Sequence, residues 1–272
     1  MNERDGRPGL AVVIPMFNEE AGAERCIQAV TAVLRKSDRR CGLIVVEDGS
    51  RDRTLDILER LLREGAPFTL VPHGCNRGYG AGLKTGATEA RRQGYEYVLF
   101  MDSDLTNPPE HIEHFFAPVG RGIDVIKGCR YVAGGEVVGV PFKRYIISYL
   151  GNLIVRPLFG VGIRDATNGF RCLKTDIFLA MPLTERGFAI IMEELYWGKR
   201  FRCTFANVPT TLYTRSDSLR GTSFSYKPST FYRYLRYAFR AAALSIPFFG
   251  WRKCRRPLPP SDAGSSTLAD AA

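Results

Sequence analysis

Short runs that are apolar almost throughout, separated by longer stretches with helical periodicity, constrain the fold of this chain more than any other feature. The apolar runs cover residues 10–15, 43–47, 68–72, 97–101 and 123–128. Such runs are typical of parallel strands that are buried on both faces of a sheet. Helices are expected between them, at about residues 18–36 and 52–64, up to residue 93, and from residue 107. The sequence therefore predicts an α/β fold in which a mostly parallel sheet carries helices on both faces.

Polar side chains gather where these runs end, at residues 18–20, 47–48, 76–77 and 102–104. The carboxyl ends of parallel strands lie at one edge of a sheet, and ligands bind outside that edge. We therefore expect a binding site there. Asn18 is expected to cap the helix that follows it, with Glu19 and Glu20 in the first turn of that helix.

Asp102-Ser103-Asp104 carries the sharpest chemical signal in the chain. Two carboxylates one residue apart, just after a buried strand, can bind one hard divalent cation, because Mg²⁺ takes one or two carboxylates together with water and substrate phosphates. Helix capping by the same acids is the alternative interpretation. His111 and His114 lie three residues apart without a nearby third ligand, so they indicate no metal site.

A glycine-rich segment, residues 76–82, precedes the third expected helix. Its backbone can approach an anion at a helix N-terminus, or its glycines can be structural. The segment matches neither the phosphate loop of nucleotide triphosphatases nor the dinucleotide-binding fingerprint. Asp48, at the end of the second strand, is suited to binding a base or ribose and equally to closing a turn.

The positive charge of the chain is concentrated near its C-terminus. The formal net charge is +10, and residues 199–256 contain thirteen Lys or Arg but a single acid, Asp217. This asymmetry indicates an acidic partner, such as phosphate groups, an anionic membrane surface or nucleic acid. A basic, solvated helix face is the alternative.

Two expected helices in the second half are amphipathic and basic. The helix at 142–159 has apolar residues on one side, and the helix at 231–242 has an apolar stripe opposite Arg233, Arg236 and Arg240. The apolar residues are Ile146, Ile147, Leu150, Leu153 and Ile154 in the first helix, and Phe231, Leu235, Ala238, Phe239 and Ala242 in the second. Such helices can lie in a membrane interface, or they can pack on the sheet.

Several motifs occur in a fixed order along the chain. The first four are residues 13–19 (VIPMFNE), residues 46–50 (VEDGS), the glycine-rich segment and residues 101–104 (MDSD). Together they resemble the glycosyltransferase family 2 enzymes, which have the GT-A fold. Residues 128–131 (GCRY), 142–148 (FKRYIIS) and 165–171 (DATNGFR), with the helix around Met192 and Glu193, look like the polyprenyl- or dolichyl-phosphate mannose synthases. The likeness runs from about residue 10 to 237.

The resemblance implies roles for particular residues of this sequence. The residues implied to bind the nucleotide and its diphosphate are Pro15, Phe17, Glu19, Asp48, Asp102 and Ser103. Asp102 and Asp104 would bind Mg²⁺ or Mn²⁺, with Thr106 as a weak third ligand where the family often has a stronger one. Those implied to hold the donor and acceptor phosphates are Arg130, Arg144, Arg215 and Ser223, and the catalytic groups among all of these are Asp104, Arg144 and Arg215.

The chemistry of the acceptor leads to the same residue types. An acceptor phosphate is already anionic near neutral pH, so it needs no strong general base. It needs cations that hold two mutually repelling anions together, which arginine does well. The sequence departs from the resemblance at Thr222-Ser223-Phe224, where a phosphate-binding lysine is missing and Lys227 is a possible substitute. The QxxRW motif of processive synthases is absent, which favours a single transfer.

The resemblance thus implies an inverting, metal-dependent transfer of one hexose, with mannose from GDP-mannose favoured, onto a polyprenyl phosphate. The first alternative is the same fold with UDP-glucose or another UDP-sugar, or with a glycolipid or sugar hydroxyl as acceptor; a hydroxyl needs a base, for which Glu193 or Asp165 could serve. The second alternative is a nucleotide-sugar-binding protein without turnover. Nucleic-acid binding is not expected, since the basic region has no identifiable reader motif.

The expected organisation follows from these features. Residues 1–9 are a charged tail without the apolar core of a signal peptide, 10–227 are the GT-A catalytic domain, 228–256 are a basic amphipathic helix at a membrane surface, and 257–272 are a disordered tail. Residues 241–251 are too short to span a bilayer, which takes about 20 apolar residues. Seven cysteines without a CxxC pair fit a reducing compartment. We therefore expect a cytoplasmic protein bound peripherally to a membrane.

Overall fold

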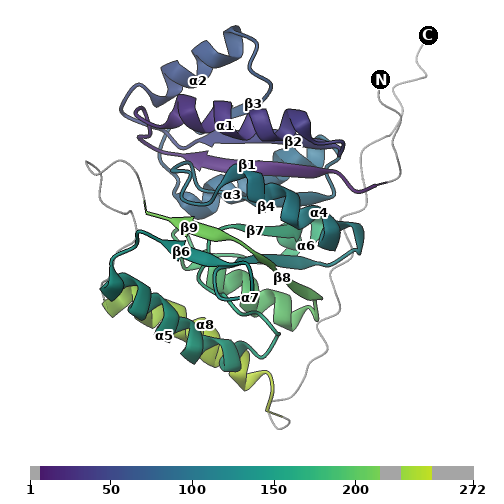
Figure 1. Cartoon of the computed structure of the whole chain (residues 1–272), viewed down its shortest axis with the longest axis vertical. Helices are drawn as coiled ribbons and strands as arrows, with labels where there is room; N and C mark the ends of the chain where they lie inside the picture. Colours follow the sequence, from purple (N-terminus) through teal and green to yellow (C-terminus); the bar gives the residue numbers. More distant parts are fainter. Residues whose placement is uncertain (1–6, 215–227, 247–272) are drawn as a thin grey trace, which may run out of the picture.

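The computed structural model describes residues 7–214 and 228–246 of the chain. Its central feature is a seven-stranded sheet in the order β3-β2-β1-β4-β7-β5-β8, with helices on both faces (Figure 1). The strands are β1 (Leu10–Met16), β2 (Cys41–Glu47), β3 (Thr69–Pro72), β4 (Tyr97–Phe100), β5 (Val125–Cys129), β7 (Arg171–Lys174) and β8 (Phe205–Pro209). In this sheet β7 is antiparallel to β4 and β5, and the other strands run parallel. The predicted mostly parallel α/β fold is confirmed.

The helices connect the strands and cover both faces of the sheet (Figure 1). They are α1 (Ala23–Lys36), α2 (Thr54–Arg63), α3 (Tyr79–Arg92), a 3-10 turn η1 (Pro109–Ile112), α4 (Glu113–Gly120), α5 (Phe142–Phe159), α6 (Thr175–Ala180), α7 (Ile190–Arg200) and α8 (Pro228–Ala243). None of them, over the residues described, is both long enough and apolar enough to cross a membrane.

Alternate residues of β1 pack against opposite faces of the sheet, and all of residues 10–14 are fully buried. Leu10 and Val12 belong to an apolar cluster that includes side chains of α1, α2 and α4. Ala11 and Val13 belong to a second cluster, with side chains of α3, α6, α7 and α8. Burial on both faces explains why the strand is apolar at every position.

The strands that the sequence did not predict lie in the second half of the chain. β7 reads Arg-Cys-Leu-Lys, yet Arg171 is only 1% exposed because it forms an ion pair with buried Glu194. A hydropathy pattern cannot identify a strand whose buried end residue is charged. A second sheet pairs β6 (Glu136–Val138) with β9 (Thr211–Tyr213), and strands of three residues carry no periodic signal.

The expectation that Asn18 caps α1 is wrong. The helix begins at Ala23, and its N-cap residue is Gly22. Asn18 adopts a left-handed backbone conformation with φ of 54°, which asparagine tolerates better than most residues. Its Oδ1 accepts a hydrogen bond of 2.8 Å from the Arg51 amide, so the side chain bridges to the β2–α2 turn instead of capping a helix. Glu19 and Glu20 consequently lie in the β1–α1 loop.

Helix α8 packs against α5 and α7, but the side that joins the main core differs from the predicted apolar stripe. Of the five stripe residues only Ala238 is buried, whereas Phe231 and Phe239 are 39% and 60% exposed. Tyr237, Ala238 and Ala241 are almost fully buried. On another side of the helix, Arg236 donates a hydrogen bond of 2.8 Å to Glu185, and Arg233 lies 3.7 Å from the same carboxylate. Packing on the protein therefore accounts for much of this helix, while the domain boundary at residue 228 stays a prediction.

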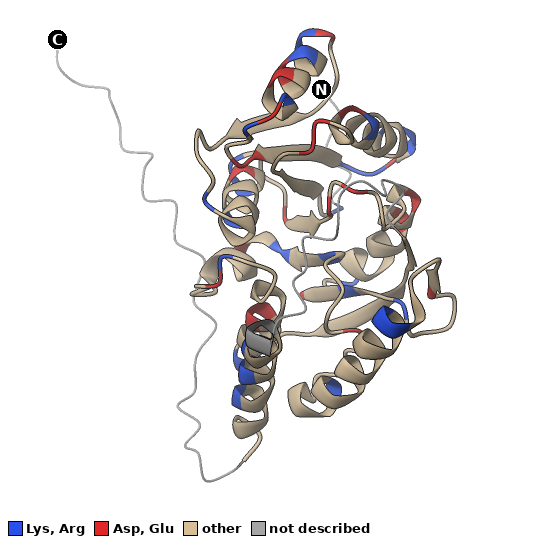
Figure 2. Cartoon of the chain, turned by 90° about the vertical axis from the view of Figure 1, so that its left-hand side faces the viewer, with Lys and Arg blue, Asp and Glu red and all other residues tan. Residues whose placement is uncertain are grey.

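Helix α5 likewise has a predicted apolar side that is mostly not covered by the described residues. Ile147, Leu150, Leu153 and Ile154 are each between 42 and 56% exposed, and Phe142 is 76% exposed. Helices α5 and α8 lie side by side (Figure 1), and basic residues occur on both of them (Figure 2). The outer surface of α5 is therefore apolar, with Lys143 and Arg144 in its first turn and Arg156 in its last.

Candidate active site

The acid pair lies directly after β4, in a loop formed by residues 101–106. Asp104 Oδ1 accepts hydrogen bonds from the Thr106 amide, at 3.1 Å, and from the Thr106 hydroxyl, at 2.9 Å. The carbonyl of Thr106 accepts a 2.8 Å hydrogen bond from the Tyr213 amide, which ties the loop to β9. Thr106 thus orients Asp104 through its hydroxyl in this structure.

Asp102 is half-buried and carries a perturbed carboxyl group. Burial, and then the charge of Asp104, raise the pKa of Asp102 to about 6, although the Arg171 guanidinium acts in the opposite direction. The two carboxylates are therefore close enough to disfavour each other's negative charge. A divalent cation between them would remove this repulsion.

The residues present fit a magnesium or manganese ion whose coordination is completed by a ligand. Among residues 7–214 and 228–246 there is no group of three or more His, Cys, Asp or Glu side chains that could enclose a metal. Two carboxylates alone leave most positions of an octahedral ion to water and to phosphate oxygens, which is how Mg²⁺ is commonly bound. Asp102 and Asp104 would hold the ion, with Ser103 half-buried between them.

The β1–α1 loop, which carries Phe17 and Glu19 among the predicted nucleotide contacts, is fixed against the β2–α2 turn. The backbone N–H of Asn18 donates to Ser50 Oγ at 2.9 Å, and the backbone N–H of Glu19 donates to Thr54 Oγ1 at 2.8 Å. Pro15 is half-buried at the end of β1, and the Phe17 side chain is 39% exposed. An exposed aromatic ring on a fixed loop is suited to stacking on a base, and the nucleotide role of these residues stays a prediction.

Asp48 is placed as a turn residue. Its carboxylate is buried and accepts hydrogen bonds from the His73 ring at 2.7 Å, and from the amides of Arg77 and Gly78, both at 2.9 Å. It closes the loop before α3, which is the alternative that the sequence left open. Its predicted contact with base or ribose is not tested by these contacts.

The glycines before and within α3 permit close packing of this helix. A Cβ atom at Gly80 would lie 2.2 Å from the Glu185 carbonyl oxygen, and one at Gly86 would lie 2.2 Å from Val13 Cγ1. Gly78 has φ of 93°, which favours glycine. The structural interpretation of the glycine-rich segment therefore explains these positions, because α3 could not otherwise reach β1 and the 185–188 segment.

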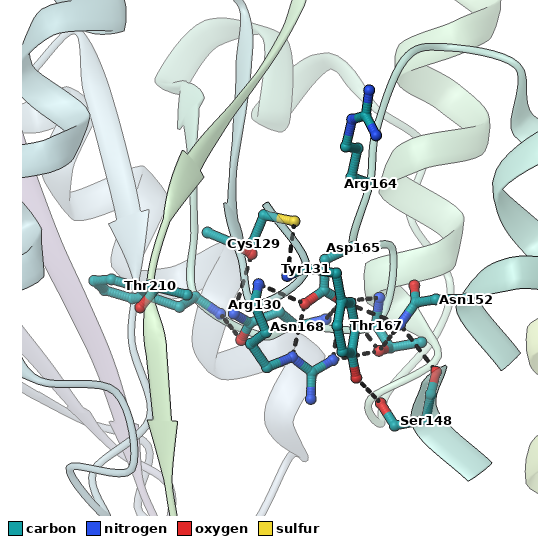
Figure 3. A network of polar contacts seen from close by, with 12 residues as sticks. Cys129, Arg130, Tyr131, Ser148, Asn152, Arg164, Asp165, Thr167, Asn168 and Thr210 are labelled. Atoms are coloured by element: carbon teal, nitrogen blue, oxygen red, sulfur yellow. Dashed lines mark hydrogen bonds and ion pairs between the residues drawn. The ribbon is translucent and has the colours of Figure 1, made fainter. Parts of the chain in front are cut away.

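Arg130 forms a buried ion pair with Asp165, shown in Figure 3. Nε of Arg130 lies 2.7 Å from Oδ2 of Asp165, and Nη2 lies 2.9 Å from Oδ1. Nη2 also donates to Thr167 Oγ1 at 2.8 Å. Burial alone would raise the pKa of Asp165, but the Arg130 charge outweighs it and the pKa lies below its ordinary value. The guanidinium is thereby held in one orientation.

Beside this ion pair is an open cavity of about 520 Å³, which is lined by Arg130, Tyr131, Val132, Ala133, Gly135, Tyr145, Tyr149 and Arg164. Tyr145 and Tyr149 stack with ring centroids 6.0 Å apart, and Tyr131 meets both of them edge-on. Sequence analysis missed these tyrosines and Arg164. The spacing of Tyr145 and Tyr149, one turn apart on α5, was the available signal. Arg144 lies half-buried in the first turn of the same helix.

Neither carboxylate proposed as a base for a hydroxyl acceptor is placed for that role. Glu193 is 2% exposed, and it accepts hydrogen bonds from the Thr184 amide and hydroxyl and from the Glu185 amide. Asp165 is fully buried against Arg130, and its lowered pKa makes it a weak base. Both acids hold loops together.

The other candidates fall outside the site or outside the described residues. His111 and His114 stack on each other and bond to Thr210 Oγ1 and to the Pro209 carbonyl, so they fasten the η1–α4 region to β8 and β9. Arg215, Ser223 and Lys227 lie outside the described residues.

Comparison with known proteins identifies the family of this chain. The family model described as Glycosyl transferase family 2 matches residues 11–179, and the chain belongs to this family. Two curated relatives are a dolichol-phosphate mannosyltransferase of Pyrococcus furiosus, 31% identical over 85% of this chain, and a polyprenol monophosphomannose synthase of Mycolicibacterium smegmatis, 30% identical over 64%. The matches cover 63% and 64% of those relatives, so this chain spans less than two thirds of their length.

The fold is shared with solved glycosyltransferases of the GT-A type. Glucosyl-3-phosphoglycerate synthase from Mycobacterium tuberculosis, in complex with Mn²⁺, UDP and glucosyl-3-phosphoglycerate, matches with a TM-score of 0.60 and 20% identity, over 89% of this chain and 82% of that chain. The same enzyme with Mg²⁺ and UDP also gives 0.60. These neighbours bind a divalent cation together with the nucleotide, and at this identity the likeness shows the common fold.

Proposed function

We propose that this protein transfers a single hexose, with mannose favoured, from a nucleotide-diphosphate sugar to a polyprenyl phosphate, with inversion. The observation that carries the proposal is that one segment, residues 165–169, contacts both the acid pair and the wall of the aromatic cavity. On one side Gly169 packs against the carboxylate of Asp102. On the other, Asp165 holds Arg130 at the wall of the aromatic cavity. An acid pair for a metal diphosphate and a cationic cavity for a second phosphate are what such a transfer needs.

The hydrogen bonding of the Asp165 and Glu193 carboxylates favours a phosphate acceptor over a hydroxyl acceptor. Because Asp165 and Glu193 are both fully engaged in hydrogen bonds, neither can take a proton from an acceptor hydroxyl. A lipid phosphate requires no such step, since its oxygen is already anionic. Arg130 would orient that phosphate, with Arg144 and Arg215 as further cations.

The donor would be held at the opposite end of the site. Asp102 and Asp104 would bind Mg²⁺ or Mn²⁺, which on binding supplies positive charge to the departing nucleoside diphosphate. Phe17, Glu19 and Asp48 would face the nucleoside. The polyprenyl-phosphate relatives include a mannosyltransferase of Micrococcus luteus and an enzyme of Pseudomonas aeruginosa that transfers 4-deoxy-4-formamido-L-arabinose, so the sugar varies among them.

A polyprenyl acceptor requires contact with a membrane, and we assign that contact to α5. Its exposed residues Phe142, Leu150, Leu153 and Ile154 form an apolar surface, and Lys143 and Arg144 lie at its start. Apolar side chains beside cationic ones are the composition that binds an anionic lipid interface. The helix also lines the cavity through Tyr145 and Tyr149, which would place the lipid phosphate near Arg130.

The test is a panel of labelled nucleotide sugars, including GDP-mannose and UDP-glucose, incubated with the full chain and vesicles that contain polyprenyl phosphate. We expect one sugar to appear in an acid-labile lipid product, with transfer abolished by EDTA or by Asp104→Asn. Transfer to a hydroxyl-bearing acceptor without polyprenyl phosphate would contradict the proposed acceptor. Nucleotide-sugar binding without any product would identify a non-catalytic protein.

A further inference from the structure

The Asp102 carboxylate is contacted on both of its oxygens by residues outside the DSD motif, Tyr79 and Gly169. The Tyr79 hydroxyl lies 3.3 Å from Oδ1 of Asp102 and donates a hydrogen bond to it. A Cβ atom at Gly169 would lie 3.1 Å from Oδ2, so the Gly169 backbone lies against the second oxygen. The neighbouring ligand, Asp104, is contacted in a different way, by a residue of its own loop.

The Tyr79 side is rigid because the start of α3 is pinned. The Tyr79 ring packs on Phe188 with centroids 4.7 Å apart, and the Gly80 amide donates to the Arg186 carbonyl at 2.8 Å. There is no room for a side chain at Gly80, since a Cβ would collide with the Glu185 carbonyl. The hydroxyl of Tyr79 therefore has a fixed position.

The Gly169 side is rigid because buried charges hold its segment. Arg171 donates to the Gly169 carbonyl at 2.7 Å, and its guanidinium forms a bidentate pair with Glu194 at 2.5 and 2.6 Å. Lys127, also buried, donates to the neighbouring Asn168 carbonyl at 2.5 Å. The backbone against Oδ2 is thus anchored by hydrogen bonds from two buried side chains, Arg171 and Lys127, the first of which is itself held by Glu194.

We propose that Tyr79, together with the backbone of Gly169, is a positioning residue that fixes the Asp102 carboxylate in the rotamer that binds the divalent cation of the donor. This inference rests on the metal site of the proposed function. A hydrogen bond from a fixed hydroxyl orients a ligating carboxylate and removes the rotational freedom that it would otherwise lose on binding. Asp104, which among the described residues is held only by Thr106 of its own loop, would then complete the binding of the ion that Asp102 presents.

The experiment measures metal-dependent nucleotide binding directly, without turnover. Preformed Mn²⁺–GDP, and in parallel Mn²⁺–UDP, is titrated into the full chain by calorimetry, and each titration is repeated with the nucleotide in EDTA. In Tyr79→Phe, which keeps the ring on Phe188, we expect affinity for the Mn²⁺ complex to fall about tenfold. Affinity for the metal-free nucleotide should stay unchanged.

The matched control is Tyr97→Phe, in the strand that leads to Asp102. Tyr97 is 2% exposed and its hydroxyl has no hydrogen-bond partner among the described residues, so its removal should leave both affinities unchanged. Gly169→Ala, whose new methyl group would press on Oδ2, should weaken the Mn²⁺ complex at least as much as Tyr79→Phe. Melting temperatures of all variants establish that they are folded.

A double variant separates positioning from a general effect. In an Asp102→Asn background, Tyr79→Phe should cause no further loss, because its effect passes through the Asp102 carboxylate. The same tenfold loss in that background, or an equal loss in Tyr97→Phe, would overturn the proposal, as would unchanged Mn²⁺ binding in Tyr79→Phe. If the wild-type chain binds nucleotide equally well with Mn²⁺ and in EDTA, the metal site of the proposed function is refuted. That result is distinct from a failure of the Tyr79 proposal, which requires Mn²⁺-dependent binding in the wild type.

Discussion

Two acidic loops of this protein lie against each other, and they use their carboxylates in opposite ways. In the loop after β4, Asp104 accepts hydrogen bonds at Oδ1 from Thr106, and its Oδ2 accepts none from the described residues. In the loop before β7, Asp165 is satisfied at both oxygens and paired with Arg130. Beside Asp104, the pKa of Asp102 is raised by burial and then by the Asp104 charge, whereas the Arg130 charge outweighs burial and lowers the pKa of Asp165. The difference teaches that one loop keeps a carboxylate oxygen available to a ligand, whereas the other uses both oxygens of its carboxylate to hold Arg130. The first is called the ligand loop, after its proposed role, and the second the scaffold loop.

The largest expected effect comes from the ligand loop. Asp104→Asn should lower the rate of sugar transfer roughly a thousandfold, about 4 kcal/mol, because the cation loses one of two protein ligands. The free energy of unfolding of the metal-free protein should change little. Steady-state transfer assays and denaturant unfolding measure the two quantities, and an active Asp104→Asn variant would remove the distinction between the loops.

The scaffold loop should respond in the opposite manner. Asp165→Ala leaves the Arg130 guanidinium buried without its counter-ion, which costs about 3–5 kcal/mol of stability. Asp102→Asn, as the matched change in the ligand loop, should leave the metal-free protein as stable or slightly more stable, since it removes a repelling charge. Equal losses in the two variants, measured by urea unfolding, would show that both acids are structural.

The two loops should also differ in their pH dependence. The pKa of Asp102 is raised to about 6, so the metal-free fold gains stability from its protonation at low pH and loses it as the pH rises through that value. A bound cation requires the ionised form, so its affinity should fall about tenfold per pH unit below that value. Asp165, with its lowered pKa, contributes stability at neutral pH that is lost only in strong acid. Mn²⁺–nucleotide titrations between pH 5 and about 7.5 would check the predicted fall in cation affinity on acidification. Affinity that rises on acidification would contradict it.

The smallest expected effect concerns Thr106. Thr106→Val removes the hydroxyl that donates to Asp104 but keeps the shape of the side chain. Loss of one hydrogen bond to a carboxylate should weaken Mn²⁺–nucleotide binding about threefold to tenfold. A loss as large as that in Asp104→Asn would instead make the Thr106 hydroxyl itself a principal ligand.

The first half of this molecule could be predicted from its sequence, because there the pattern and the packing agree. β1, β2 and β4 are apolar at nearly every position because both faces are covered, and the acid pair follows β4 as expected. The second half could not be predicted equally well. Strand β7 contains a buried arginine, so its hydropathy does not indicate a strand. The tyrosines of the cavity come from α5 and from the position after Arg130, and these two segments are separate in the sequence.

Local chemistry also left some roles undetermined. Asn18 fits the pattern of a helix cap, but the β2–α2 turn competes for its side chain. Asp48 carries a motif for nucleotide binding, yet the structure places three donors around its carboxylate. Whether an acid has all its carboxylate oxygens hydrogen-bonded depends on partners about 25 to 35 residues away in the sequence. Examples are His73 for Asp48 and Arg130 for Asp165. A short linear motif does not contain that information.

The most direct test of the central claim is a calorimetric titration of the full chain with GDP and with UDP, in Mn²⁺ and in EDTA, for the wild type and for Asp102→Asn/Asp104→Asn. The account predicts that one nucleotide binds the wild type much more tightly in Mn²⁺ than in EDTA, and that this difference disappears in the double variant. A double variant that keeps the full Mn²⁺ dependence would contradict the account.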